Sequence, residues 1–202
     1  MSVTVIMYHH AMGRWEPNAR GRLAAAAMTL HAEQGFEQTT VAEIAARAGL
    51  TERTFFRHFA DKREVLFYGT EMVLDLLART VADALATATP MDAVGAALEA
   101  VGAVIQENPE RARLRNAVIS VNAELREREL IKLAAFATTL AAALRERGIS
   151  EPTASLAAET GIAVFKVAFT RWLSEQGQPD LPRTIRQSIE EVKGVLTVRA
   201  PV

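Results

Sequence analysis

Alanine constrains the fold of this chain more than any other residue type, because it fills 37 of the 202 positions. It has the highest helix propensity of the amino acids and is depleted from β-strands. The 11 glycines and 7 prolines are few, and they stand where helical stretches would begin or end. This distribution predicts an all-α fold.

The rest of the composition excludes several classes of protein. Hydrophobic residues make up 50% of the chain and charged residues 23%, which is typical of a globular rather than a disordered protein. The absence of cysteine excludes disulfides, thiol nucleophiles and cysteine-ligated zinc. Charges interrupt every apolar stretch before it reaches the roughly 18 residues of a membrane span. Taken alone, the net charge of −1 argues against nucleic-acid binding.

Apolar residues at helical spacing, with N-cap residues and glycines at the ends, divide the chain into about nine helices. Thr40 is predicted to cap the second helix, with Glu43 as its capping-box partner. The fourth helix is predicted to be long, from residue 62 to about residue 87. Gly69 would lie inside this helix, where glycine weakens the structure, and our hypothesis is that it lets the helix tilt when a ligand binds, which would change the spacing of the two recognition helices. Close packing against another helix is the alternative role of this glycine.

The helix pattern predicts two domains after an N-terminal lead-in. Residues 1–15 show neither helical spacing nor the pattern of a signal peptide, and we expect a flexible lead-in there. Residues 16–67 contain three short helices that we expect to form one small domain. Residues 68–202 are predicted to form a larger helical domain for ligand binding and dimerisation.

Residues 40–59, with the sequence TVAEIAARAGLTERTFFRHF, have the punctuation of a helix-turn-helix. In this motif a tight turn joins two short helices, and the second helix enters the major groove of DNA. Gly49 supplies a left-handed turn residue, and Phe55 and Phe59 anchor the second helix inward. The outward positions carry arginine, glutamate and threonine, which can pair with guanine, cytosine and thymine respectively.

The stretch from residue 20 to residue 67 resembles the DNA-binding domain of TetR-family transcriptional regulators. The resemblance rests on the helix-turn-helix punctuation, on the preceding helix with its alanines, and on the trailing Asp61-Lys62. It implies an all-helical homodimer that binds a palindromic operator, usually as a repressor that a small molecule releases.

The resemblance also implies DNA contacts for individual residues. Thr40 and Lys62 match positions that contact phosphates, and residues 51–54 match the base-facing start of the recognition helix. Phe56 stands where the family commonly has tyrosine, and it cannot donate a hydrogen bond to a phosphate, so a neighbour is expected to supply that contact. The predicted DNA-binding residues are Thr40, Thr51, Glu52, Arg53, Thr54, Phe56, Arg57, His58 and Lys62.

Positive charge is concentrated in the motif although the whole chain is nearly neutral. From Arg47 to Arg63 there are five basic and two acidic residues, a net charge of +3. Residues 66–202 contain 15 basic and 17 acidic residues, a net charge of −2. The basic residues therefore gather where a phosphate footprint requires them.

The eighth predicted helix has apolar residues on two sides, which indicates burial on two sides. One side can face its own domain and the other a second copy of the chain, together with the ninth helix. A central core helix without a partner is the alternative. The predicted dimer interface comprises Leu156, Val164, Val167, Arg171, Ile185, Ile189 and Val192.

A ligand pocket is predicted between the helices of the larger domain, because such pockets are mostly apolar with a few polar groups. The small side chains of this domain suggest a small, mostly apolar effector. Tight packing without a ligand predicts the same composition. The predicted pocket residues are Arg113, Asn116, Phe136, Phe165, Phe169 and Trp172.

Signals of an enzyme are absent from the sequence. All four histidines lie in the first third, no Glu-x-x-His occurs, and the common phosphate-binding, dinucleotide-binding and hydrolase motifs are missing. We therefore expect no catalytic residue, no metal site and no cofactor.

These observations together predict a cytoplasmic, ligand-responsive regulator of transcription. Its expected partners are double-stranded operator DNA, a small-molecule effector and a second copy of itself, without a membrane. An activator of the same fold, and a helical ligand-binding protein without a DNA function, stay open as alternatives.

Overall fold

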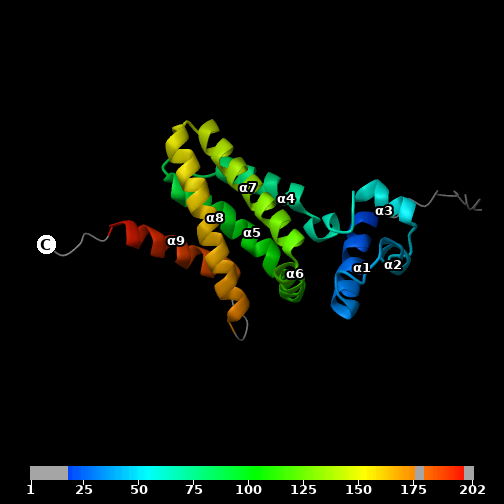
Figure 1. Cartoon of the computed structure of the whole chain (residues 1–202). Coiled ribbons are helices and arrows are strands. Elements are labelled where there is room, and N and C mark those ends of the chain that lie inside the picture. The colour runs from blue at the N-terminus through cyan, green and yellow to red at the C-terminus, as the bar shows by residue number, and fades with distance from the viewer. Residues whose placement is uncertain (1–17, 176–179, 198–202) are drawn as a thin grey trace, which may run out of the picture.

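The computed structural model describes residues 18–175 and 180–197, which form nine α-helices and one 3-10 helix without a β-strand (Figure 1). The predicted all-α fold is confirmed, whereas the predicted lead-in, residues 1–15, lies outside the described residues. The helices are α1 (Ala19–Gln34), α2 (Val41–Arg47), α3 (Glu52–His58), the 3-10 helix η1 (Glu64–Phe67), α4 (Thr70–Ala82), α5 (Pro90–Gln106), α6 (Pro109–Val121), α7 (Ala123–Glu146), α8 (Glu151–Ser174) and α9 (Leu181–Thr197).

Helices α1, α2 and α3 pack together with η1, and we call this group the N-terminal unit (Figure 1). Its core contains Leu23, Ile44, Phe55 and Val65, each at most 1% exposed. Val65 comes from η1, so η1 is part of this core and not only a connection. The three short helices therefore hold one another through a single apolar cluster.

The ends of α2 follow from local hydrogen bonds. The Thr40 hydroxyl accepts a hydrogen bond from the backbone N–H of Glu43 at 3.2 Å, and the Glu43 carboxylate accepts one from the backbone N–H of Thr40 at 2.8 Å. This is the predicted capping box, which is confirmed. After α2, Gly49 has φ 66°, a conformation that residues with a Cβ resist.

Helices α4–α9 form a larger group, which we call the bundle. Helix α5 packs against α4, α8 and α9, and α7 packs against α4 and α8. Trp172, Leu98 and Leu140 lie at its centre and are at most 1% exposed. Helix α6 is the bundle helix that packs against α1. Among the helices of the described ranges, none has both the length and the apolar character that a membrane crossing requires.

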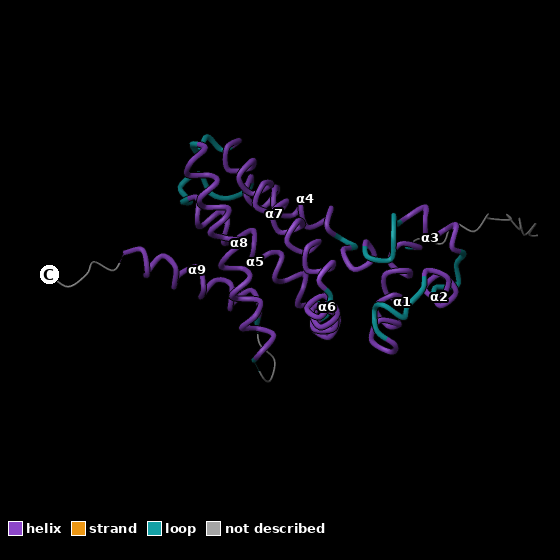
Figure 2. The backbone as a smooth tube through the Cα atoms, viewed as in Figure 1, coloured by secondary structure: helices purple, strands orange, loops and turns teal. Residues whose placement is uncertain are grey.

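The predicted long fourth helix is wrong at its start. The structure has η1 instead, followed by a turn in which Tyr68 has φ −56° and ψ 131° and Gly69 has φ 95°, and α4 begins only at Thr70. Figure 2 shows a loop before α4. A left-handed residue cannot continue a right-handed helix, so Gly69 separates two helices rather than weakening one. The Thr70 hydroxyl donates to the carbonyl oxygen of Phe67 at 2.6 Å and closes this turn.

The predicted end of the fourth helix, near residue 87, is also too late. Helix α4 ends at Ala82, and the guanidinium of Arg147 donates hydrogen bonds to the carbonyl oxygens of Val81, Ala84 and Leu85 at 3.0, 2.6 and 2.8 Å. The carbonyls at the end of α4 are thus satisfied by a side chain from the end of α7, which removes the need for further helical turns.

Candidate nucleic-acid interface

The turn between α2 and α3 fixes the position of the second helix of the motif. The backbone N–H of Leu50 donates to the carbonyl oxygen of Ala45 at 2.8 Å, and Thr51 then caps α3 by accepting from the N–H of Thr54. Ala45 is 1% exposed, because α3 packs directly against α2 there. The turn therefore holds α3 across α2 as the helix-turn-helix motif requires.

Helix α3 has a buried side and an exposed side. Phe55 and Phe59 are 0% and 3% exposed, with ring centroids 5.5 Å apart, in the core of the N-terminal unit. The predicted base-facing residues Thr51, Glu52 and Arg53 are exposed, and Thr54 is half-buried. The first turn of α3 is thus open to a partner along its whole outer side.

The basic residues of the motif divide into two kinds. Arg47 pairs with Glu33 through two hydrogen bonds of 3.1 and 2.8 Å, and Arg63 pairs with Glu124. Arg53 and Arg57 are exposed, and within the described residues neither has a hydrogen bond or an ion pair. Free positive charge on α3 therefore comes from these two arginines.

Lys62 is held by the N-terminal unit itself. Its ammonium donates to the carbonyl oxygens of Phe36, Glu37 and Thr39 at 3.0, 3.2 and 3.2 Å, and it lies 4.5 Å from the centre of the Phe36 ring. These contacts use all three N–H groups of the ammonium. A phosphate contact by Lys62 would have to replace one of them, and this contact stays a prediction.

Thr40 is exposed, but its hydroxyl is already hydrogen-bonded to a carboxylate. The hydroxyl donates to the Glu43 carboxylate at 2.8 Å. Hydrogen bonds from the backbone and then the side chain of Thr40 lower the pKa of Glu43, so this group is ionised near neutral pH. A phosphate approaching Thr40 would meet a negative charge, and its predicted phosphate contact also stays a prediction.

Phe56 and His58 differ in how far they reach the surface. Phe56 is 56% exposed and makes an edge-on contact with the ring of Phe55. His58 is half-buried, and burial, followed by the charges of Arg57 and Arg20, lowers its pKa. The imidazole is therefore neutral near pH 7 and adds no positive charge to the surface. A DNA contact by either residue stays a prediction.

Arg22 is a residue of this surface that the sequence pattern did not indicate. Its guanidinium donates to the carbonyl oxygen of Ala48, and a Cβ on Gly49 would lie 3.0 Å from the same guanidinium. Arg22 thus fastens the end of α2 to α1. The partners are 26 residues apart, and an arginine on a helix has no local pattern that could reveal such a contact.

Four of the six predicted pocket residues contact one another. Phe165, Phe169 and Trp172 form a continuous aromatic stack with centroid distances of 6.0 and 5.7 Å, and the Arg113 guanidinium lies 5.2 Å from the Trp172 ring. Phe136 packs partly buried against the same core, and Asn116 is half-buried on α6. The stack is closely packed, and a ligand contact by these residues stays a prediction.

Three residues of the predicted dimer interface are buried within the single chain, and their place in an interface stays a prediction. Val164, Ile185 and Ile189 are 4%, 0% and 3% exposed, in the core of their own bundle. At about 100° per residue, Val164 lies about 80° around the helix from Leu156, on the side of α8 that faces the bundle. Helix α9 covers α5 with its apolar side, where Ile189 lies against Gly95.

The other predicted interface residues lie at or near the surface. Leu156 and Val167 are 69% and 51% exposed, and Val192 is half-buried. Arg171 is exposed and pairs with Glu191 on α9 at 2.7 Å. A second copy of the chain could reach these four side chains. Their part in a dimer interface stays a prediction.

Comparisons with known proteins support the motif. Residues 23–68 match the family model described as bacterial regulatory proteins, tetR family. The HTH-type transcriptional regulator TcmR of Streptomyces glaucescens is 35% identical over 82 residues, which are 41% of this chain and 36% of that protein. The match with this curated relative therefore spans about a third of its length.

Solved structures support the fold of the whole chain. The fatty acid degradation regulator FadR of Bacillus halodurans has a TM-score of 0.66 at 18% identity, covering 91% of this chain and 99% of that one. SmeT, the repressor of a multidrug efflux pump of Stenotrophomonas maltophilia, was solved with triclosan and has a TM-score of 0.64 at 22% identity, covering 91% of this chain and 98% of that one. The first of these proteins is described as a regulator and the second as a repressor. The chain thus contains a segment, residues 23–68, that is similar to bacterial regulatory proteins of the tetR family, and its fold is similar to that of these two solved structures.

Proposed function

We propose that this protein is a homodimeric repressor that binds a palindromic operator and is released by a small, mostly apolar effector. The observation that carries the proposal is the outer side of α3, where Arg53 and Arg57 are exposed and have no hydrogen bond or ion pair with any described residue. Residues that are already paired with their own chain have less to gain from a phosphate or a base. A recognition helix needs free donors at this place.

Base reading is assigned to the first turn of α3. Arg53 can donate to O6 and N7 of a guanine, and Glu52 can accept from the amine of a cytosine. Thr51 and Thr54 already share a hydrogen bond between their hydroxyls at 3.1 Å, which leaves their methyl groups for a thymine. Arg57 lies one turn later, where a phosphate contact is geometrically simpler than a base contact.

Dimerisation is assigned to the exposed apolar side of α8, with α9 beside it. Leu156 and Val167 are large, apolar and more than half exposed, and Ala163 between them is exposed as well. A second copy of the chain would bury this stripe across a twofold axis and would pair two recognition helices. Two half-sites then give a palindromic operator.

Effector binding is assigned to the bundle, which we propose as residues 68–202, with residues 16–67 as the DNA-binding domain. Triclosan, with which SmeT was solved, is a small and mostly apolar molecule. Opening the aromatic stack of Phe165, Phe169 and Trp172 would expose a surface of the same character. Operator and effector would then select different arrangements of the chain and oppose each other by linkage.

Repression is supported by the similarity to SmeT, which is described as the repressor of a multidrug efflux pump. A repressor and an activator of this fold would differ in where the operator lies relative to the promoter. We also propose that the protein acts in the cytoplasm, since its DNA partner is found there.

A gel-shift titration with the DNA that flanks its own gene tests the proposal. A single shifted band that competitor DNA of unrelated sequence does not remove is the expected result. Random-sequence DNA, enriched by repeated binding to the protein, extends the test to operators elsewhere in the genome. The DNA-binding function is refuted if neither source yields a duplex that the protein prefers.

A further inference from the structure

The backbone between the N-terminal unit and the bundle does not by itself fix their relative orientation. Helix η1 and α4 are separated by Tyr68 and Gly69, and Gly69 has φ 95°. A continuous helix would transmit orientation rigidly, whereas two residues outside a helix allow rotation about several backbone bonds. Side-chain contacts must therefore hold the two parts in register.

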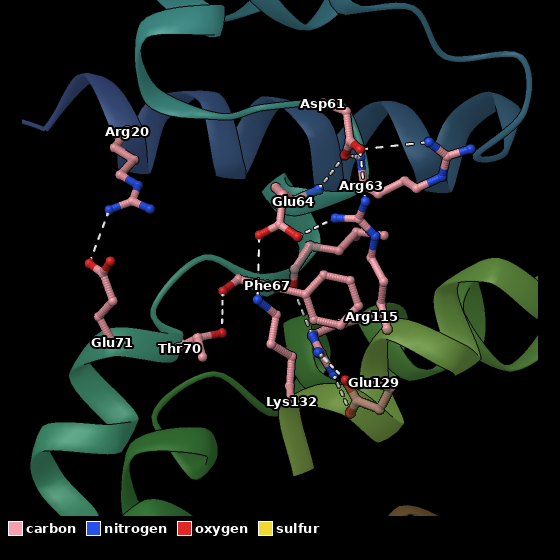
Figure 3. A network of polar contacts seen from close by, with 12 residues as sticks. Arg20, Asp61, Arg63, Glu64, Phe67, Thr70, Glu71, Arg115, Glu129 and Lys132 are labelled. Atoms are coloured by element: carbon pink, nitrogen blue, oxygen red, sulfur yellow. Dashed lines mark hydrogen bonds and ion pairs between the residues drawn. The ribbon is translucent and has the colours of Figure 1, made fainter. Parts of the chain in front are cut away.

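Charged side chains of α7 reach across to η1 and to Asp61, which precedes η1 in the chain. The Arg128 guanidinium pairs with Glu64 and, at 2.9 Å, with Asp61. The Lys132 ammonium lies 3.6 Å from the same Glu64 carboxylate (Figure 3). We call Asp61, Glu64, Arg128 and Lys132 the charge clamp. Its four side chains are between 28% and 32% exposed, so each charge is largely withdrawn from water.

Helix α6 adds a second contact with the same short helix. Arg115 donates to the carbonyl oxygen of Leu66 at 2.8 Å and pairs with Glu129 of α7 through two hydrogen bonds of 3.0 and 2.6 Å. Its guanidinium lies 5.1 Å from the centre of the Phe67 ring. Figure 3 shows these two side chains beside each other. Arg115 thus ties α6, α7 and η1 together.

Movement of η1 necessarily moves the recognition helix. Val65 of η1 is 1% exposed and shares the core of the N-terminal unit with Phe55 and Phe59 of α3. Asp61 binds the start of η1 as well as Arg128, because its carboxylate accepts from the backbone N–H groups of Arg63 and Glu64 at 2.8 and 3.0 Å. The charge clamp therefore binds the N-terminal unit at η1, which shares its apolar core with α3.

We propose that Arg128 and Lys132 are positioning residues, which hold the recognition helix at the angle that fits the operator and release it when α6 and α7 move. This inference rests on the proposed function and adds the route by which the bundle controls DNA binding. Apolar side chains of η1, α6 and α7 also pack together at this junction, but apolar attraction is not directional. A guanidinium bound to two carboxylates has a directional geometry, and a small displacement breaks it.

Spin-label distances test the orientation directly. The chain has no cysteine, so two can be introduced, at exposed Ala46 of α2 and exposed Ala134 of α7, and labelled with nitroxides. Dilution with unlabelled protein leaves only distances within one chain. We expect one narrow distance distribution in the parent, and a broader or shifted one after Arg128→Gln.

Matched variants separate the clamp from general effects of charge. Arg145→Gln removes an arginine of the same helix that pairs with Glu151 at 2.6 Å, far along the chain from η1, and we expect it to keep the narrow distribution. Arg128→Lys keeps the charge but cannot bind both carboxylates in the same way, and we expect an intermediate width. If Arg128→Gln does not fold, as judged by its helical circular dichroism, Arg128→Lys decides.

Operator affinity gives the second measurement, with a duplex that the parent protein selects from random-sequence DNA. Arg128→Gln and Glu64→Gln change the net charge in opposite directions, yet both open the clamp. We expect both to weaken binding by roughly fivefold or more, because only a fraction of the molecules holds the binding-competent orientation. Their double variant should lose little beyond either single change.

Two outcomes overturn the inference. One is an unchanged distance distribution in Arg128→Gln and Glu64→Gln. The other is weaker binding after Arg128→Gln but tighter binding after Glu64→Gln, which is what attraction of the whole chain to DNA would produce. If the parent selects no duplex, the proposed function fails, and the spin-label distances alone decide whether the clamp sets the orientation.

Discussion

Arg53 and Arg57 differ from the other basic residues of their motif in having no partner among the described residues. Arg47 is neutralised by Glu33, and Lys62 is surrounded by three carbonyl oxygens. The sequence showed that positive charge gathers between residues 47 and 63. It could not show which of these charges are free, because their partners lie on other helices.

Arg53→Ala is expected to weaken operator binding by about 1–3 kcal/mol and to relax the preference at one operator position. The reason is that a guanidinium bound to two acceptors of a guanine distinguishes this base from the others. Binding should be measured by competition against duplexes with single base changes, with Arg57→Ala as the matched variant. An equal loss on all duplexes after Arg53→Ala would assign this residue to a phosphate instead.

His31 is a buried residue with a predictable response to acid. Its side chain is 3% exposed, and neither ring nitrogen has a hydrogen-bond partner among the residues that the structure describes. Burial, followed by the charge of Lys62, lowers its pKa to about 4. The unfolded chain binds this proton near pH 6.5. Between these two values the unfolded state holds more protons than the folded state, so acid favours unfolding.

We therefore expect the free energy of unfolding to fall as the pH drops from 6.5 towards 4, by up to about 1.4 kcal/mol per pH unit from this residue. Chemical denaturation at pH 7, 6 and 5 measures the slope. His31→Leu removes the titrating group from a buried site and should make the slope shallower. Equal slopes in the parent and the variant would show that other groups cause the acid sensitivity.

At the scale of elements, helix ends were predictable where a side chain marks them. The capping box of Thr40 and Glu43 and the turn at Gly49 are local patterns, and the structure contains both. The start of α4 was not predictable in this way, because apolar residues keep their spacing through Gly69. Periodicity does not report the sign of φ at a single residue.

Gly69→Ala tests the conformation of this junction. A Cβ at Gly69 would meet no atom within 4 Å, so a loss of stability would come from the backbone, with φ 95°, and not from a clash. We expect a loss of about 1–2 kcal/mol in the free energy of unfolding. Thermal or chemical unfolding measures it.

Gly95→Ala is the matched control, because its Cβ would make only an ordinary contact, 3.5 Å from Ile189, and Gly95 lies within helix α5. This change should be neutral or stabilising, because alanine favours a helix by up to about 1 kcal/mol over glycine. A loss at Gly95 equal to that at Gly69 would contradict the backbone explanation.

At the scale of the whole molecule, apolar stripes did not reveal which partner covers them. The sequence indicated two apolar sides on α8, and the structure assigns Val164 to the protomer's own core and leaves Leu156 and Val167 exposed. On α9, Ile185 and Ile189 face α5 and α8 rather than the surface. A helix pattern gives the angle of a residue around its axis, whereas the neighbours come from the fold.

Val167→Glu is expected to convert the proposed dimer into monomers at micromolar concentration. Near a twofold axis each introduced carboxylate would be buried without a cation and close to its symmetry mate. The molar mass from light scattering after size-exclusion chromatography measures the effect. Val121→Glu, at a valine of α6 that is 83% exposed, should leave the mass unchanged. If the unsubstituted protein has the molar mass of a single chain, the proposed dimer is wrong.

The internal pairing of Arg47, Lys62 and Arg63 has a consequence for how the protein searches a genome. Of the free cations on α3, only Arg57 is proposed to contact a phosphate, which gives about two such contacts in a dimer. The logarithm of the association constant should therefore fall with the logarithm of salt concentration with a slope of about −2. Such a shallow slope means little attraction to DNA of arbitrary sequence. The protein would then spend short times on wrong sites, and its discrimination would depend on the bases that α3 touches.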